Sequence, residues 1–192
     1  MDEKGVIMST ITLVEEPKDF ISQGDIFSDI NYIMKFKEQS DYVDITELKI
    51  PYIIVLSQAC DMRGMYELKN NNGKSTKQII SVLVAPIFEK ASVQSGQYLA
   101  DCLQKGILSE KGFNSDEYKL ILSDFHYRFH TLQFEASFKS IPESVIDFKQ
   151  FFTLNIDYLY ENIHKRVCSL QPIFKSQVTL KFSNFLSRVA IP

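Results

Sequence analysis

The chain has 192 residues, 45% of them hydrophobic, which is enough for one well-buried core. Its 21 basic and 24 acidic side chains give a formal charge of −3, so nucleic-acid binding would need a local basic groove. No segment approaches the ~20 apolar residues of a membrane span, and the N-terminus lacks the apolar run of a signal peptide, so we expect a cytoplasmic protein with no membrane contact.

The cysteines are Cys60, Cys102 and Cys168. An odd number of widely spaced cysteines fits neither a disulfide framework nor a zinc knuckle. We therefore expect free thiols in a reducing compartment, no metal site and no cofactor.

The first forty-nine residues contain only weak sequence patterns for secondary structure. We expect residues 1–20 to form a flexible arm or a short edge strand, because the short run ITLV stands between Ser9-Thr10 and the turn-like EEPKD. A strand is predicted from Asp25. The polar stretch 37–49 is predicted to be a loop.

Residues 51–62, PYIIVLSQACDM, carry the most informative pattern. The apolar run predicts a strand buried on both faces, and the polar residues that follow it stand where such strands deliver side chains to a site. These candidate ligand-binding residues are Ser57, Gln58, Cys60 and Asp61. A carboxylate beside a thiol opposes its activation as a nucleophile, so the alternative is a structural Cys60 with Asp61 as a turn or helix-cap acceptor.

The middle of the chain predicts a loop, a strand and a helix. Residues 63–78, with Asn70 to Gly73 as a strong turn signal, are expected to form a mobile loop. Residues 79–87, IISVLVAPI, predict a second core strand, antiparallel to the first. Apolar spacing near 3.6 predicts a helix near 91–105, ended by Gly106.

Residues 125–130 alternate between aromatic and polar side chains. A strand here would place Phe125, Tyr127 and Phe129 on one face, with His126, Arg128 and His130 on the other. The polar residues are candidate catalytic groups, with Arg128 as a charge clamp for phosphate and a histidine as proton donor. The alternative is a solvated strand face opposite an aromatic core face, and no third ligand for a metal is apparent.

Two further predictions concern the C-terminal part. Residues 144–154 predict a pair of strands. Residues 172–189 predict an amphipathic helix, with Pro172 in its first turn and aromatic residues at steps of three and four. This helix is expected to pack on the core, although a chain-end apolar helix can also dock on a partner.

Three motifs, in order along the chain, resemble the MazF/PemK toxin family. They are Gly24-Asp25-Ile26, PYIIVLS at 51–57 and VLVAPI at 82–87. The resemblance covers roughly the first ninety residues and implies an SH3-like barrel that dimerises and cleaves single-stranded RNA. The family's catalytic arginine corresponds to Ile50 and its hydroxyl residue to Phe88, so both catalytic groups are absent here.

We therefore expect an α+β protein: a small SH3-like, MazF/PemK-like barrel at 21–156 with an inserted helix near 91–105, and a helical extension at 157–192. The expected function is a non-catalytic or divergent MazF/PemK-like module of a bacterial stress, toxin-antitoxin or antiphage system. It would bind a protein partner or single-stranded RNA, and the motifs are also compatible with a homodimer. Two competing hypotheses are an endoribonuclease with relocated catalytic groups at His126, Arg128 and His130, and a structural protein that docks through its C-terminal helix.

Overall fold

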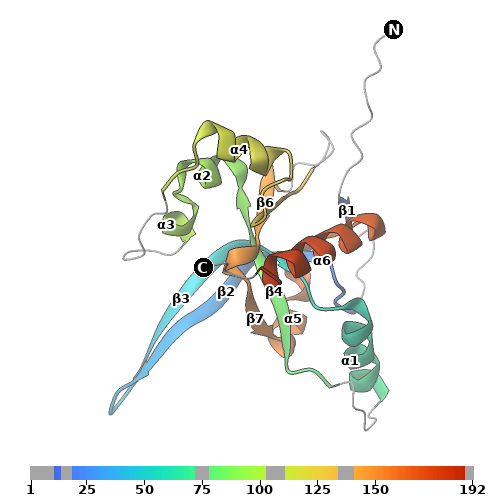
Figure 1. Cartoon of the computed structure of the whole chain (residues 1–192). Coiled ribbons are helices and arrows are strands. Elements are labelled where there is room, and N and C mark those ends of the chain that lie inside the picture. The colour runs from blue at the N-terminus through green and yellow to red at the C-terminus, as the bar shows by residue number, and fades with distance from the viewer. Residues whose placement is uncertain (1–10, 14–18, 72–77, 103–110, 134–140, 189–192) are drawn as a thin grey trace.

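The computed structural model describes residues 11–13, 19–71, 78–102, 111–133 and 141–188. They form an α+β fold in which helices surround one curled antiparallel sheet (Figure 1). The strands are β1 (Ile11–Leu13), β2 (Asp25–Glu38), β3 (Val43–Val55), β4 (Ser81–Glu89), β5 (Phe129–Thr131), β6 (Ser144–Asp147), β7 (Phe152–Asn155) and β8 (Arg166–Leu170). The helices are α1 (Ala59–Asn71), α2 (Lys90–Ser95), α3 (Tyr98–Cys102), α4 (Ser115–Leu122), α5 (Ile156–Glu161), α6 (Pro172–Leu186) and the 3-10 turns η1 (Phe148–Gln150) and η2 (Ile163–Lys165).

The sheet is built around β4. Its strand order is β1-β8-β2-β3-β4-β6-β5, and β7 also pairs with β4. On one edge of β4, β7 pairs with 81–84 and β6 pairs with 87–89. Pro86 belongs to neither of these two ladders, so its missing N–H does not interrupt them. Residues 144–154 thus form two strands as predicted, but each pairs with β4 instead of with the other.

The strand predicted to be buried on both faces is confirmed as the end of β3. Ile53, Ile54 and Val55 have no exposed surface. Ile54 packs in the cluster that contains α6, whereas Ile53 and Val55 pack in the cluster that contains α1 and α5. The predicted antiparallel pairing with the second apolar run is also confirmed, since Ile54 stands opposite Ala85 of β4.

Helices cover both faces of the sheet. Val178 and Phe182 of α6 pack on one face, and Met62 of α1 and Leu159 of α5 pack on the other. The predicted C-terminal helix is therefore confirmed at Pro172–Leu186, and residue 189 lies outside the described ranges. No helix in the described ranges combines the length and the apolar character needed to cross a membrane.

The helix predicted near 91–105 is divided in two. Gly96 ends α2 with a left-handed φ of 76°, a conformation that glycine adopts at little cost, and α3 begins two residues later. These helices pack with α4 in a third cluster around Phe88, Tyr98 and Phe129. Gly106 lies outside the described residues.

Two predicted loops are wrong. Residues 37–49 belong mostly to the long hairpin of β2 and β3, whose strand character is hidden in the sequence by its many charges. The stretch after Asp61 is helix α1, because Met62 and Met65 give it an apolar side that packs on the sheet. The turn residues 72 and 73 lie outside the described part.

The segment 157–192 contains more than helix. β8 lies inside the sheet, between β1 and β2, so the C-terminal part supplies a strand to the core as well as α6. Most of the predicted arm 1–20 lies outside the described residues. Its described segment 11–13 is a strand paired with β8.

Candidate functional site

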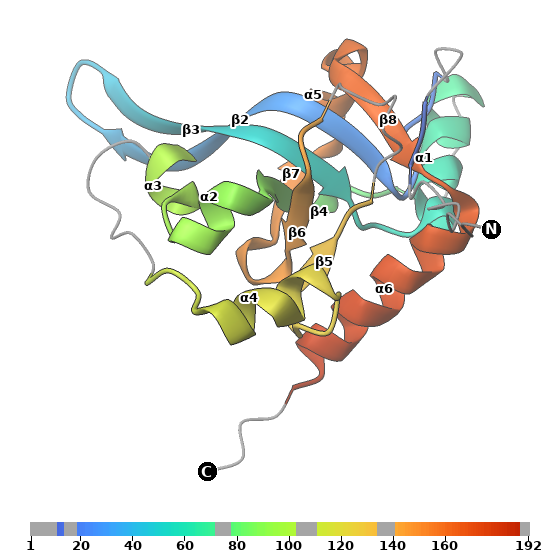
Figure 2. The same cartoon turned by 90° about the horizontal axis from the view of Figure 1, so that it is seen from above.

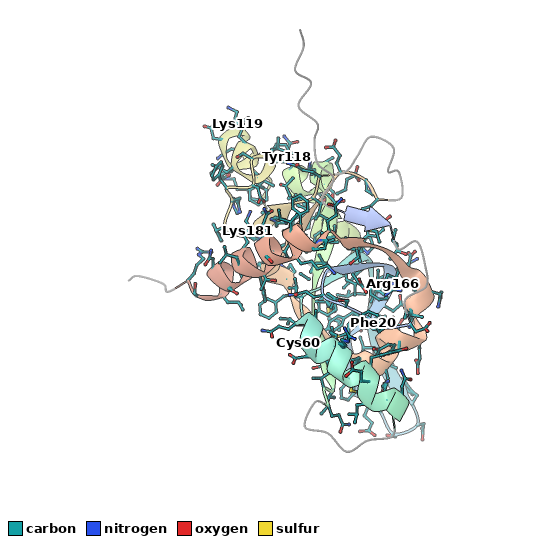
Figure 3. The ribbon with its side chains drawn as sticks, turned by 90° about the vertical axis from the view of Figure 1, so that its right-hand side faces the viewer. Phe20, Cys60, Tyr118, Lys119, Arg166 and Lys181 are labelled. Atoms are coloured by element: carbon teal, nitrogen blue, oxygen red, sulfur yellow. The ribbon has the colours of Figure 1, made fainter. Side chains whose placement is uncertain are left out.

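The polar residues after β3 lie at the start of α1. Ser57 Oγ accepts a hydrogen bond of 2.8 Å from the backbone N–H of Leu83, which ties this turn to β4. Gln58, Cys60 and Asp61 are exposed. Figure 3 shows Cys60 at the end of α1 that lies toward α6.

Gln58 and Cys60 line an open groove between α1 and α6, with a volume of about 520 Å³. The opposite wall includes Thr179, which accepts a hydrogen bond of 2.9 Å from Gln23 Nε2. The Cys60 thiol contacts Gln58 Oε1 at 3.5 Å and Asp61 Oδ1 at 3.7 Å. Both contacts are with oxygen acceptors, whereas a nucleophilic thiolate is usually placed beside a cation.

Arg128 is part of a buried ion pair. Its Nε and Nη2 each donate a 2.7 Å hydrogen bond to the carboxylate of Asp147, and Nη2 also donates to the Tyr98 hydroxyl. Arg128 is 6% exposed, Tyr98 1% and Asp147 0%. This bidentate geometry neutralises the guanidinium inside the protein and leaves it structural.

His130 and Asp124 lie close together at the start of β5. His130, which is buried, places Nδ1 3.1 Å from Asp124 Oδ2. Lys181 of α6 bonds to the other carboxylate oxygen at 2.5 Å. Burial acts to raise the pKa of Asp124, but the contacts with His130, Lys181 and the Thr131 N–H outweigh it, so the pKa is lowered.

His126 lies apart from this pair, half-buried between rings. It stacks on Tyr127 with 4.7 Å between ring centroids, and its Nδ1 accepts a hydrogen bond from the Arg128 N–H. Burial, followed by the nearby charge of Arg128, lowers the pKa of the imidazole. His126 is therefore a neutral acceptor at neutral pH.

The predicted strand alternation at 125–130 is wrong. Phe125 and Tyr127 are 81% and 51% exposed, whereas Arg128 and His130 are buried. The strand begins only at Phe129, because the N–H groups of Phe125 and His126 bond back to the Leu120 carbonyl of α4, after a turn in which Asp124 has a left-handed φ of 62°. The polar residues expected to share a solvated face thus fall in different environments.

The hairpin of β2 and β3 extends beyond the body of the protein (Figures 1 and 2). β8 pairs with β2 only at 25–27, and β4 pairs with β3 only at 52–55. Within the described residues, the outer edges of both strands carry no neighbouring strand beyond these points. Unpaired edges offer N–H and C=O groups to another chain.

One face of this hairpin is apolar and exposed. Residues paired directly across an antiparallel ladder share a face, and successive pairs alternate between faces. The register pairs Phe36 with Ile45, Glu38 with Val43 and Ile33 with Glu47. We call the resulting surface the hairpin face; its apolar members are 50–72% exposed and are Ile33, Phe36, Val43 and Ile45.

The opposite face of the hairpin is polar near its tip. It carries the pairs Lys35–Thr46 and Lys37–Asp44. Nearer the body this face becomes apolar, where Tyr32 packs on Phe152 with 4.6 Å between ring centroids. The hairpin is therefore anchored by one face at its base and exposes the apolar side chains of the other face at its tip.

A groove lies at the outer edge of β2, where the hairpin leaves the body. Its volume is about 470 Å³. It shares Ile33 and Glu47 with the hairpin face, so the two surfaces are continuous. The other lining residues come from β2, β7, α5 and η2: Asn31, Tyr32, Thr153, Leu154, Asn155, Tyr158, Asn162 and Lys165.

The sequence prediction missed this surface for an identifiable reason. The register shifts between Ile33 and Lys35, where β2 has one extra residue, Met34. That bulge brings Ile33 and Phe36, three positions apart, to the same face and breaks the period of two. The alternation of β3, with Val43 and Ile45 separated by Asp44, is the signal that could have found it.

In the part of the chain that the structure describes, no three histidine, cysteine or acidic side chains gather in a way that could hold a metal ion. Comparison with protein-family models and with curated proteins gives no match for this chain. The geometry of its surfaces is therefore the basis for a functional proposal.

Proposed function

We propose that this protein is a non-catalytic, MazF/PemK-like module that binds a protein partner through the hairpin face. The observation that carries the proposal is the set of large apolar side chains on one face of a projecting hairpin whose outer edges have no neighbouring strand among the described residues. Scattered exposed apolar residues are ordinary, but a contiguous group on a projecting element is typical of an interaction surface.

The burial of the candidate catalytic positions supports a binding role. Cleavage of RNA by a toxin of this type needs an accessible cation and a group that moves the 2′-hydroxyl proton. Ile50 and Phe88, at the two positions where the family has its catalytic groups, are 6% and 5% exposed. Arg128, the cation expected to replace the missing arginine, is bonded to Asp147 inside the protein.

The proposed biological setting is a bacterial stress, toxin-antitoxin or antiphage system. In such a system, a module without catalytic groups acts by binding another protein. The binding surface is supplied by the exposed apolar face of the hairpin and by its edges, which have no neighbouring strand among the described residues.

A second candidate function is binding of single-stranded RNA, favoured by one specific observation. Arg188 places its guanidinium carbon 3.5 Å from the centroid of the exposed Tyr127 ring. An arginine stacked on an exposed aromatic ring, with Phe125 close by in the chain, resembles the stacking surfaces that hold unpaired bases. Loss of RNA binding in Tyr127→Ala and Arg188→Ala, but not in hairpin variants, would support this function.

The main proposal is tested with purified protein in two assays. In the first, mixed single-stranded RNA should remain intact after incubation; cleavage would contradict the non-catalytic role. In the second, cross-linking in lysate of the native host should capture a specific protein, and Ile45→Lys should abolish the capture. Thr46→Lys is the matched control, since it adds the same charge to the next residue on the opposite face. Equal capture by both variants would overturn the hairpin face as the binding surface.

A further inference from the structure

We infer that the partner contributes one extended strand, with alternating apolar and acidic residues, that adds to the outer edge of β2. This inference rests on the proposed function and names the class of partner. It follows from the open edge, from the two faces of the hairpin and from the charges along β2.

The outer edge of β2 is closed near the body and open toward the tip. After β8 ends its pairing at Phe27, Ser28 Oγ contacts the Lys165 carbonyl, and the Asn31 N–H donates a 3.0 Å hydrogen bond to the Tyr158 hydroxyl. Within the described residues, no strand or side chain bonds to this edge between Tyr32 and Glu38. An added strand can therefore pair with this stretch of β2.

The groove described above marks where the added strand would enter. It contains Asn31, Tyr32 and Ile33, the residues at which the open edge begins. A volume of about 470 Å³ is sufficient for a few side chains at one end of a bound strand. Because the groove continues into the hairpin face through Ile33, one strand can occupy both.

The side chains on the two faces of β2 determine which residues are favoured at alternate positions of the partner strand. On the hairpin face, Ile33 and Phe36 offer apolar side chains to a neighbour. On the opposite face, Lys35 and Lys37 are exposed, and neither ammonium has an ion-pair partner among the described residues. Cross-strand neighbours of opposite charge stabilise a sheet, so acidic residues are favoured beside these lysines.

A third lysine also favours acidic residues in the partner strand. Lys165 lines the groove, with its Nζ bonded to the Asp29 carbonyl, a neutral acceptor. Against these three lysines stand Glu47, which lines the groove, and Asp44, which is paired with Lys37, so this side of the hairpin keeps an excess of one positive charge. An alternating apolar and acidic strand matches this edge in both polarity and charge.

The test uses a fluorescent nine-residue peptide in which valine alternates with glutamate, added to the full-length protein. Fluorescence anisotropy should show saturable binding, at least about tenfold tighter than for the same peptide with lysine in place of glutamate. A third peptide, N-methylated at every residue, has no backbone N–H to donate to a ladder and should not bind. Equal binding of the glutamate and lysine peptides, or binding of the methylated one, would overturn the inference.

A charge-reversal variant makes the test specific. Lys35→Glu together with Lys37→Glu should reverse the preference toward the lysine peptide. Lys111→Glu together with Lys119→Glu is the control, because both lysines are exposed and lie outside the hairpin, so the change in net charge is the same. Hydrogen exchange of the amides at 33–38 should slow when the glutamate peptide binds.

Two further outcomes separate this inference from the proposed function. If none of the peptides binds while Ile45→Lys still abolishes capture of the native partner, the class of partner is wrong and the hairpin face remains the binding surface. If the protein self-associates at micromolar concentration and Lys35→Glu prevents it, the occupant is a second copy of this chain, which overturns the inference of a separate partner.

Discussion

At the scale of single residues, burial decides the role of Arg128. A guanidinium that stabilises a phosphate must be accessible to it, whereas Arg128 is 6% exposed and bonds to Asp147 and Tyr98. The three residues come from separate parts of the chain. Their shared role is to join β6, α3 and the start of β5 inside the third cluster.

Replacement of Arg128 should therefore destabilise the protein strongly. Arg128→Met leaves the Asp147 carboxylate buried without its cation, and we expect the free energy of unfolding to fall by about 3–5 kcal/mol. Arg63→Met is the matched control, because Arg63 forms an exposed pair with Glu67 whose loss should cost no more than about 0.5 kcal/mol. Urea denaturation measures both, and equal losses would show that the Arg128 pair does not stabilise the fold.

Asp124 couples stability to pH. Because its pKa is lowered in the folded protein, its contribution to stability is complete above the ordinary aspartate pKa of 3.8 and disappears as the pH falls through the lowered value. Asp124→Asn keeps a residue that tolerates the left-handed φ but removes the charge. The variant should be less stable than the wild type at pH 6, and the difference should shrink as the pH is lowered toward 3. A difference that stays constant over this range would contradict the proposed role of the charge.

At the scale of elements, β3 combines two environments in one strand. Toward its C-terminal end Ile53 and its neighbours are covered on both faces, whereas near the hairpin tip Val43 and Ile45 are exposed. Isoleucine and valine favour strands in both places. Their energetic roles differ, because burial depends on which other elements cover the strand.

Two isoleucine substitutions in β3 should separate these roles. Ile53→Ala should lower the free energy of unfolding by about 2–5 kcal/mol, since it leaves a cavity in the core. Ile45→Ala should cost less than about 1 kcal/mol, because it changes only strand propensity and exposed surface. Thermal and urea unfolding of the two variants measure this difference. A large loss in Ile45→Ala would show that the hairpin face is covered by part of this chain.

At the scale of the whole molecule, the final helix closes the core. Phe182 of α6 packs on Phe148 with 5.4 Å between ring centroids, and Val178 packs in the same cluster. The apolar side of α6 is therefore occupied by the sheet. Ile173, Leu180 and Leu186 of the same helix are 53–64% exposed, so α6 also presents apolar side chains away from the core.

Loss of the α6 contact should affect global stability. Phe182→Ala should lower the free energy of unfolding by about 3–5 kcal/mol, because it removes a ring from the core. Leu180→Ala on the same helix, where the side chain is 64% exposed, should change it by about 0.5 kcal/mol at most. Chemical denaturation followed by circular dichroism compares them. Similar values for the two variants would mean that α6 is only loosely attached.

The sequence by itself determined two central strands and the final helix of this protein. The apolar runs of β3 and β4 and the aromatic spacing of α6 were recognisable, because long apolar runs and helical periods are local properties that burial rewards wherever they occur. It also identified Arg128 and His130 as chemically notable. It did not show that both are buried, because the partners of Arg128, Tyr98 and Asp147, lie 30 and 19 residues away along the chain.

Only the tertiary structure decided which surfaces of the hairpin remain exposed. A one-residue bulge at Met34 sets the faces of β2, and the ends of β4 and β8 determine where the hairpin loses its neighbours. Exposure of the hairpin face and of the β2 edge depends on what the rest of the chain covers. This exposure depends on contacts between residues that are distant in the sequence, so no local pattern of residues predicts it.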